Sequence, residues 1–265
     1  MNKIFHKQYL YFLLIIFIGL IYFISKFSFK NGHPTCDNYV FNVYLYLGMS
    51  LCLIGLYTYV LNELMWGNSI EKNSSMTITD IYKKFGMYYI SSLIISFVLI
   101  IILSYRNLYS LNGHVLNHIL WLLFILCISV MLYPLFKDEK TSTNTDDALI
   151  GTSIIFICMS LIVYIYPSFF VKTYDFMMVG LMVGLFSVII ILIINFFIGN
   201  NTNQGWRKYL TYFIILLFSL FVSYDTITVF KEAKHCVNYP NYPKSSLNFF
   251  LDILNLFSSL MNSYS

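Results

Sequence analysis

Residues 176–198 read FMMVGLMVGLFSVIIILIINFFI, an apolar run without a charged side chain. A helix of this length rises about 34 Å, which is enough to cross the hydrocarbon core of a bilayer, about 30 Å thick. Polar residues bound the run on both sides, with Asp175 before it and the pair Asn200-Asn201 after it. The stretch therefore predicts a transmembrane helix.

Seven other apolar stretches lie between polar breaks in the same way. The last is short, so it could span at an angle, sit in the middle of a bundle, or enter the membrane and return. The longest connection predicted between stretches is residues 62–86. The seven stretches are residues 9–24, 39–61, 87–105, 116–136, 148–166, 209–230 and 247–261.

The composition agrees with a chain that lies mostly in lipid. The 265 residues are 58% hydrophobic and 11% charged, whereas soluble domains are about 45–50% apolar and about 25% charged. Eight spans of about 20 residues would use about 160 residues. The net charge of +4 is spread thinly over loops, so we expect no nucleic-acid partner. The expected partners are the lipid bilayer and proteins that bind the loops; the oligomeric state is not predicted.

Two features inside the apolar stretches concern packing. The first stretch follows Lys3 and Lys7 like a signal peptide but lacks a small-residue cleavage site, so we interpret it as an uncleaved anchor helix. Gly180 and Gly184 form a small-xxx-small pair, which would let another helix approach closely. We favour ordinary packing inside one bundle over a dimer interface.

Two acidic residues, Asp225 and Asp252, lie within apolar stretches. An acid at the centre of a membrane helix costs about 2.5–3.5 kcal/mol on insertion scales, so it is usually functional. The two stretches are consecutive and share the connection 231–244, which places both acids about 8–10 Å below the same membrane face. Equal depth on antiparallel neighbours allows the two carboxyl groups to meet.

The stretch around Asp252 also carries Asn248, Asn255 and Ser259, at spacings that put them on one helical face. We expect this face to point into the bundle. Two carboxyl groups in a low dielectric cannot both ionise cheaply, so they would share a proton or bind a cation. The pair therefore predicts a proton switch or a calcium site. The alternative is that each Asp only hydrogen-bonds a neighbouring helix and fixes the packing.

The sequence gives little support for a metal site or a catalytic site elsewhere in the chain. His114 and His118 have the spacing of two metal ligands on a helix, but no further Cys, His or acid is placed to complete a site. The sequence contains no phosphate loop, nucleophile elbow, His-Glu-x-x-His or Cys-x-x-Cys motif. We therefore expect no catalysis and no cofactor, with calcium possible as a transported ion.

The C-terminal third resembles a known family. Tyr224-Asp225-Thr226, followed after a polar loop by SLNFFLDILNLF at residues 246–257, is similar to the end of the Bax inhibitor-1 family, also called transmembrane BAX inhibitor motif or lifeguard proteins. There, Tyr-Asp-Thr closes the sixth helix and a run with the same Asn, Leu and Asp spacing forms a central seventh helix. Residues 43–49, together with Gly55, are a vaguer match to the family's first helix.

This resemblance implies an all-α polytopic membrane bundle with seven family helices over residues 39–261 and one extra helix in front. We divide the chain into an anchor, residues 1–30, and a family domain, residues 31–265. Family members are described as leaking calcium across the endoplasmic reticulum or bacterial membrane and as suppressing cell death. By resemblance, a pH-sensitive latch falls on Asp225 and Asp252, with Tyr224, Thr226, Asn248, Asn255 and Ser259 in support.

Two departures from the family keep another function class open. The family's bacterial channel has a basic residue on the second helix, but residues 87–105 contain none and Arg106 follows them. The family's third helix often carries small and acidic residues, whereas residues 116–136 contain neither Gly nor an acidic residue. The alternative is a structural multi-pass protein of the internal membrane of a large AT-rich virus. A secondary transporter ranks last because we see no internal repeat.

The loops leave the orientation open. The sequons beginning at Asn73 and Asn200 fall on one side of the membrane, and Cys36 and Cys236 fall on the other. If the family's first helix keeps its usual direction, the sequons face the lumen and the cysteines stay reduced. The opposite orientation permits a disulfide between Cys36 and Cys236. The expected location is an endoplasmic reticulum-type or viral internal membrane.

Overall fold

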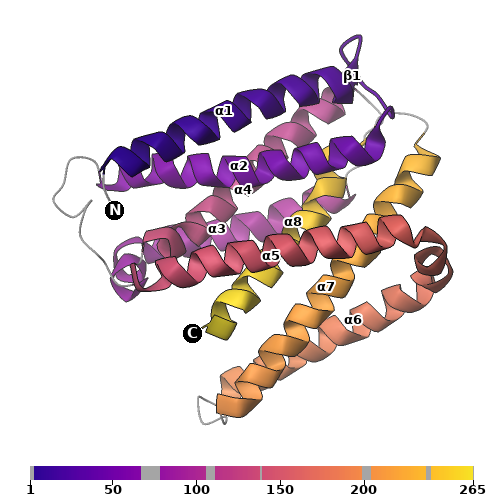
Figure 1. The fold of residues 1–265 in the computed structure, drawn as a ribbon. Coiled ribbons are helices and arrows are strands. Elements are labelled where there is room, and N and C mark those ends of the chain that lie inside the picture. Colours follow the sequence, from indigo (N-terminus) through magenta and orange to yellow (C-terminus); the bar gives the residue numbers. More distant parts are fainter. Residues whose placement is uncertain are drawn as a thin grey trace. The chain divides into compact units, whose positions relative to one another are not determined.

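The structure is a computed structural model, and it describes residues 3–66, 78–105, 111–137, 139–198, 204–236 and 240–264. This part of the chain forms eight α-helices and a short hairpin (Figure 1). Each predicted apolar stretch corresponds to one helix, so the all-helical prediction is confirmed. The helices are α1 (Lys3–Ser28), α2 (Tyr39–Trp66), α3 (Ile78–Tyr105), α4 (Leu111–Lys137), α5 (Glu139–Ile165), α6 (Pro167–Ile198), α7 (Gln204–His235) and α8 (Tyr242–Tyr264).

Most helices extend beyond the predicted stretches. The predicted connection over residues 62–86 is shorter than expected, because α2 continues to Trp66 and α3 begins at Ile78. Helical hydrogen bonding does not stop at the first polar side chain, so the helices continue past the apolar residues at their ends.

Seven of the described helices are long and apolar enough to cross a membrane, and α8 is not among them. Its 23 residues, Tyr242–Tyr264, would reach across a bilayer, but its serines and asparagines make it too polar. The sequence singled out this last stretch because it is short, but α8 is long enough to span, and its composition is what sets it apart. The seven candidate spans are Gln8–Ser28, Tyr39–Leu64, Phe85–Tyr105, His114–Pro134, Thr145–Ile165, Pro167–Asn195 and Gly205–His235.

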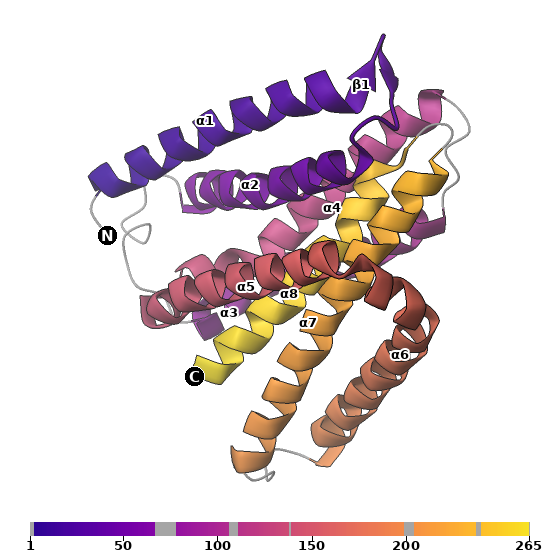
Figure 2. The same cartoon turned by 45° about the vertical axis from the view of Figure 1, so that its right-hand side comes forward.

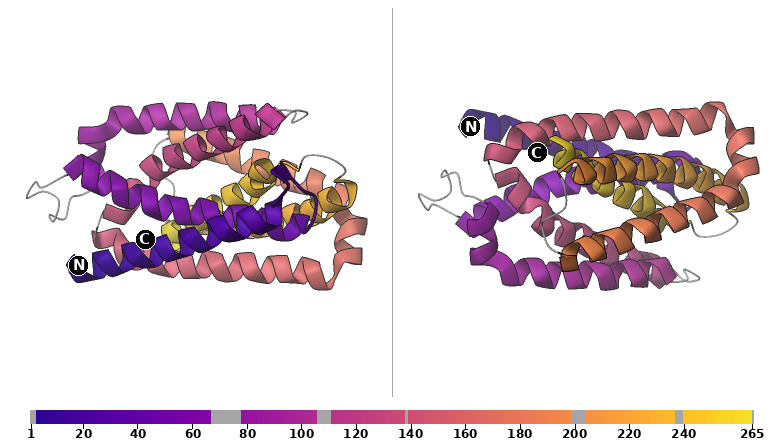
Figure 3. Two further views of the ribbon diagram at one scale, coloured as in Figure 1. Left: turned by 90° about the horizontal axis from the view of Figure 1, so that it is seen from above. Right: turned by 90° about the horizontal axis from the view of Figure 1, so that it is seen from below.

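The chain divides into two compact units. The first contains residues 1–142 and 235–247. In it, α2 packs against α1 and α4, and α4 also packs against α3. The left view of Figure 3, seen from above, shows α1 crossing α2. The predicted boundary at residue 30 falls inside this unit and stays a prediction.

A two-stranded hairpin joins α1 to α2. Strand β1 (Phe29–Lys30) pairs antiparallel with β2 (His33–Pro34). The turn residues Asn31 and Gly32 have φ values of 53° and 77°. Positive φ at both central residues is the geometry for which Asn-Gly is preferred in two-residue hairpins. The hairpin was not among the sequence predictions.

A disulfide between Cys36 and Cys236 ties the α1–α2 connection to the segment that follows α7. Beside it, the Tyr242 hydroxyl donates a hydrogen bond to the backbone oxygen of Thr35. The same hydroxyl accepts a hydrogen bond from Asn42 Nδ2 at 3.0 Å. Of the two alternatives left open by the sequence, the structure therefore has the oxidised pair.

The second unit contains residues 143–234 and 248–265. Here α6 and α7 run side by side (Figure 2), and buried contacts such as that of Val188 with Leu217 join them. A Cβ atom added at Gly184 would lie 2.7 Å from Leu217 Cδ1, whereas one added at Gly180 would meet nothing within 4 Å. Gly184 therefore packs within the bundle, as we favoured for the pair, whereas Gly180 is exposed and makes no such contact.

Candidate functional site

The two buried acids, Asp225 on α7 and Asp252 on α8, both belong to the second unit. Asp225 lies ten residues before the end of α7 at His235, and Asp252 lies ten residues after the start of α8 at Tyr242. Each acid is therefore about 15 Å from that end of its helix. Both helices continue into the predicted connection, and a common membrane depth of 8–10 Å stays a prediction. The two carboxyl groups are close enough to act on each other electrostatically.

Burial and hydrogen bonding decide what this pair can do. The exposed fractions of Asp225 and Asp252 are 7% and 5%. Asp252 Oδ2 is buried and has no hydrogen-bond partner in the described part of the chain. A carboxylate only accepts hydrogen bonds, so a bond between two carboxyl groups requires a proton on one of them. The pair can therefore hold one proton between α7 and α8.

Tyr224 belongs to a closed hydrogen-bond network next to the pair. Its hydroxyl donates to the Tyr174 hydroxyl of α6 at 2.9 Å, and the Tyr174 and Thr228 hydroxyl oxygens lie 3.2 Å apart. Thr228 in turn donates to the backbone oxygen of Tyr224 at 2.9 Å. The two tyrosine rings stack with centroids 4.8 Å apart, and Lys231 Nζ lies 3.1 Å from the Tyr174 ring centroid. This network fixes α7 against α6 one residue from Asp225.

The remaining charged and polar neighbours come from α5 and α7. Thr226 donates to the backbone oxygen of Val222 at 2.7 Å, and its hydroxyl oxygen lies 3.5 Å from that of Ser160 on α5. Glu232, two turns beyond Asp225 on α7, also acts on Asp225 electrostatically. Thr226 thus helps to place α7, and Glu232 adds a second negative charge along the same helix.

The polar stripe of α8 is only partly buried, which corrects one prediction. Asp252 and Ser259 are buried, but Asn248 and Asn255 are exposed. The Asn255 amide donates to the backbone oxygen of Leu251 in its own helix at 2.8 Å. The two asparagines are rotated about 40–60° from Asp252 around the helix axis, so they lie at the edge of the stripe, where the helix is no longer covered.

Both ring nitrogens of His118, on α4, are engaged by neighbouring groups. His118 Nδ1 lies 2.7 Å from the backbone oxygen of His114, and Nε2 lies 2.7 Å from the Tyr46 hydroxyl. Within the described residues, no group of three or more His, Cys, Asp or Glu side chains could hold a metal ion. Arg106 and both sequons lie outside the described residues.

Comparison with known protein families finds one match that covers both acids. The sequence model described as inhibitor of apoptosis-promoting Bax1 matches residues 36–264, which is most of the chain. The chain belongs to this Bax inhibitor-1 family. No individual curated protein matches it significantly. The family match contains the Asp225–Asp252 pair and all of α2–α8, and it begins after α1, so the extra N-terminal helix is confirmed.

The sequence did not reveal Tyr174 and Thr228. Tyr174 is fifty residues from Tyr224 and shares no motif with it, so nothing in the sequence pairs them. Thr228 follows Tyr224 by four residues, and this spacing does place the two on one helical face. In this Bax inhibitor-1 family member, the sequence could therefore have predicted the contact between Tyr224 and Thr228 within α7, but not the contact of Tyr224 with Tyr174 on α6.

Proposed function

We propose that this Bax inhibitor-1 family protein is a pH-sensitive calcium leak of an endoplasmic reticulum-type membrane, and that Asp225 and Asp252 form its latch. The buried, facing pair of carboxyl groups is the observation that supports this proposal. One shared proton joins α7 to α8. Loss of that proton leaves two negative charges in a low dielectric, and their repulsion favours separation of the helices.

Calcium enters this proposal as the ion that passes, not as a resident ligand. Two carboxyl groups offer at most four oxygens, whereas calcium in proteins takes about 6–8. The cell-death suppression described for the family is proposed as a consequence of the leak, because the leak lowers the calcium content of the compartment. Protein partners of the loops would modulate it.

The test is calcium flux from proteoliposomes that contain the full chain, measured with a trapped indicator across a pH series through neutrality. Asp225→Asn keeps the shape of the side chain and supplies an amide N–H that can donate to Asp252 at every pH. We expect its flux to be constant across the series and close to that of the wild-type protein at the acidic end. Asp225→Asn combined with Asp252→Asn should likewise show no pH dependence.

Asp175→Asn is the matched control, because Asp175 is an exposed acid on α6. It should keep the wild-type pH profile. An unchanged profile in the double Asn variant would refute the latch. Absence of flux at any pH in the wild-type protein would refute the leak itself and favour a structural multi-pass membrane protein.

A further inference from the structure

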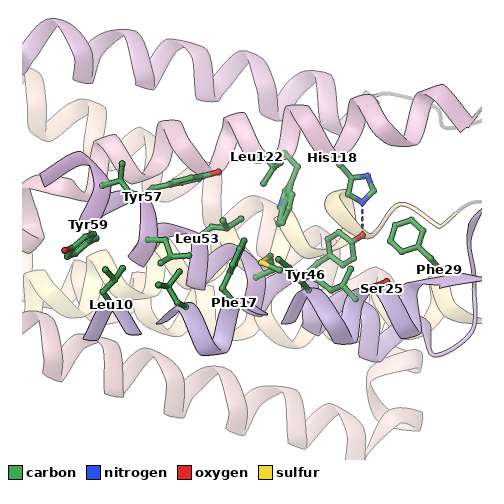
Figure 4. A pocket seen from close by; sticks show the side chains of 17 residues that line it. Leu10, Phe17, Ser25, Phe29, Tyr46, Leu53, Tyr57, Tyr59, His118 and Leu122 are labelled. Carbon is green, nitrogen blue, oxygen red and sulfur yellow. Dashed lines mark hydrogen bonds between the residues drawn. The ribbon is translucent and has the colours of Figure 1, made fainter. Parts of the chain in front are cut away.

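The first unit contains a long cavity of about 790 Å³ between α1, α2 and α4. Figure 4 shows Leu10 and Tyr59 towards one end, Phe17 and Leu53 in the middle, and Tyr46 towards the other end. One wall is α1, which precedes the family match at residues 36–264. The cavity is therefore a feature that the extra helix adds to the family fold.

The size and shape of the cavity suit a hydrocarbon chain. Its α1 wall runs from Leu10 to Ser25, a rise of about 22 Å along the helix. An apolar cavity of about 150 Å³ holds one benzene molecule, so by volume this one has room for roughly 30 carbon atoms. A volume of that size spread over about 22 Å is long and narrow, which favours an extended chain over a compact ligand.

One end of the cavity is polar but uncharged. A backbone carbonyl only accepts, so His118 Nδ1 must donate to the His114 oxygen at 2.7 Å. In a neutral ring Nε2 then accepts from the Tyr46 hydroxyl, whose oxygen lies 2.7 Å away. The residues that line the cavity, within the described chain, include no Asp, Glu, Lys or Arg. The site therefore offers no counter-ion to a carboxylate or a phosphate.

Trp121 supplies an unused donor at this end. Its exposed fraction is 4%, its ring centroid lies 5.6 Å from that of Tyr46, and it lines the cavity. Its Nε1–H has no hydrogen-bond partner among the described residues. A buried donor of this kind is costly unless an acceptor meets it. The ligand that completes the site carries a neutral acceptor, such as an ester carbonyl, at one end of a long apolar chain.

The membrane itself supplies such molecules. All three helices that wall the cavity contain candidate membrane spans, and the α1 span is only 6% buried, so its outer face meets lipid. We propose that the cavity binds one acyl chain of an ester-linked membrane glycerolipid, with an ester carbonyl accepting a hydrogen bond from Trp121 Nε1–H. This proposal is independent of the Asp225–Asp252 latch.

The test uses native mass spectrometry of the full chain in mild detergent, titrated with 1-palmitoyl-2-oleoylphosphatidylcholine. A diether phosphatidylcholine of the same chain lengths lacks the ester carbonyls and serves as the matched ligand. We expect one lipid to be retained, with the ester form bound about 2- to 10-fold more tightly than the diether form. Trp121→Phe keeps an aromatic ring without the donor and should bind the two lipids equally.

A second pair of variants tests the cavity without touching Trp121. Leu14→Trp fills the cavity from α1 and should reduce lipid retention at least tenfold. Ile15→Trp is the control, because Ile15 is 70% exposed and does not line the cavity. Equal retention by these two variants would refute the site. Equal affinity of the wild-type protein for ester and diether lipids would refute the hydrogen bond to Trp121.

Discussion

At the scale of single residues, Asp225 and Asp252 are each other's principal partner, so the effect of a substitution depends on what it leaves behind. Asp252→Leu leaves the Asp225 carboxyl group buried and without its partner. We expect this variant to lose about 1–3 kcal/mol of unfolding free energy. Asp252→Asn keeps both the shape and a hydrogen bond, so its loss should be much smaller. Unfolding titrations in mild detergent measure both variants.

The comparison needs an acid whose carboxyl group is exposed. Asp175 lies at the surface of α6, so Asp175→Leu should change the unfolding free energy by much less than Asp252→Leu. Equal losses for Asp252→Leu and Asp252→Asn would show that the pair does not stabilise the packing of α8 against α7.

The same residues show how far the sequence could predict the site. The two acids were found because a charge in an apolar stretch is expensive, and consecutive helices were expected to put them at one depth. The burial of Asn248 and Asn255 was predicted wrongly, since spacing gives a common face but not the width of the neighbouring helix that covers it. The Tyr174–Tyr224 contact required the tertiary fold.

At the scale of helices, α6 and α7 are in tight contact where Gly184 faces Leu217. Gly184→Leu forces a larger side chain into this contact, and overpacking of this kind costs about 1–3 kcal/mol. Gly180→Leu, one turn earlier on α6, meets open space and should be nearly neutral. Thermal unfolding in detergent compares the two variants directly. A larger loss for Gly180→Leu would mean that another surface covers this side of α6.

Helices were predictable because twenty apolar residues in lipid have few alternatives to a helix. The hairpin between α1 and α2 was not predicted, although Asn31-Gly32 is a strong local signal for a two-residue turn. Its strands are only two residues long, too short for the alternation by which strands are recognised. The Asn31-Gly32 pair was therefore the only feature of the sequence from which this hairpin could have been predicted.

At the scale of the whole chain, the Cys36–Cys236 disulfide bears on orientation. Cys36 follows the first span and Cys236 follows the seventh, so by the count of crossings both lie on the same side, whether or not α8 crosses. Disulfides persist in oxidising compartments. In an endoplasmic reticulum-type membrane we therefore expect this side to be the lumen, and by the count of crossings we expect the N-terminus and both sequons on the cytosolic side.

This orientation predicts the behaviour of the chain in sealed microsomes. Without reductant, wild-type protein should migrate faster on gels than Cys36→Ser or Cys236→Ser, because the disulfide closes a loop of 200 residues.

After mild reduction, a membrane-impermeant maleimide should label Cys36 and Cys236 only when the membrane is permeabilised. The double variant Cys36→Ser, Cys236→Ser measures the background labelling of other thiols. Neither Asn73 nor Asn200 should carry a glycan. A glycan at Asn73 in a molecule with the disulfide intact would contradict the crossing count between the two cysteines, because sequon and disulfide would then share the lumen.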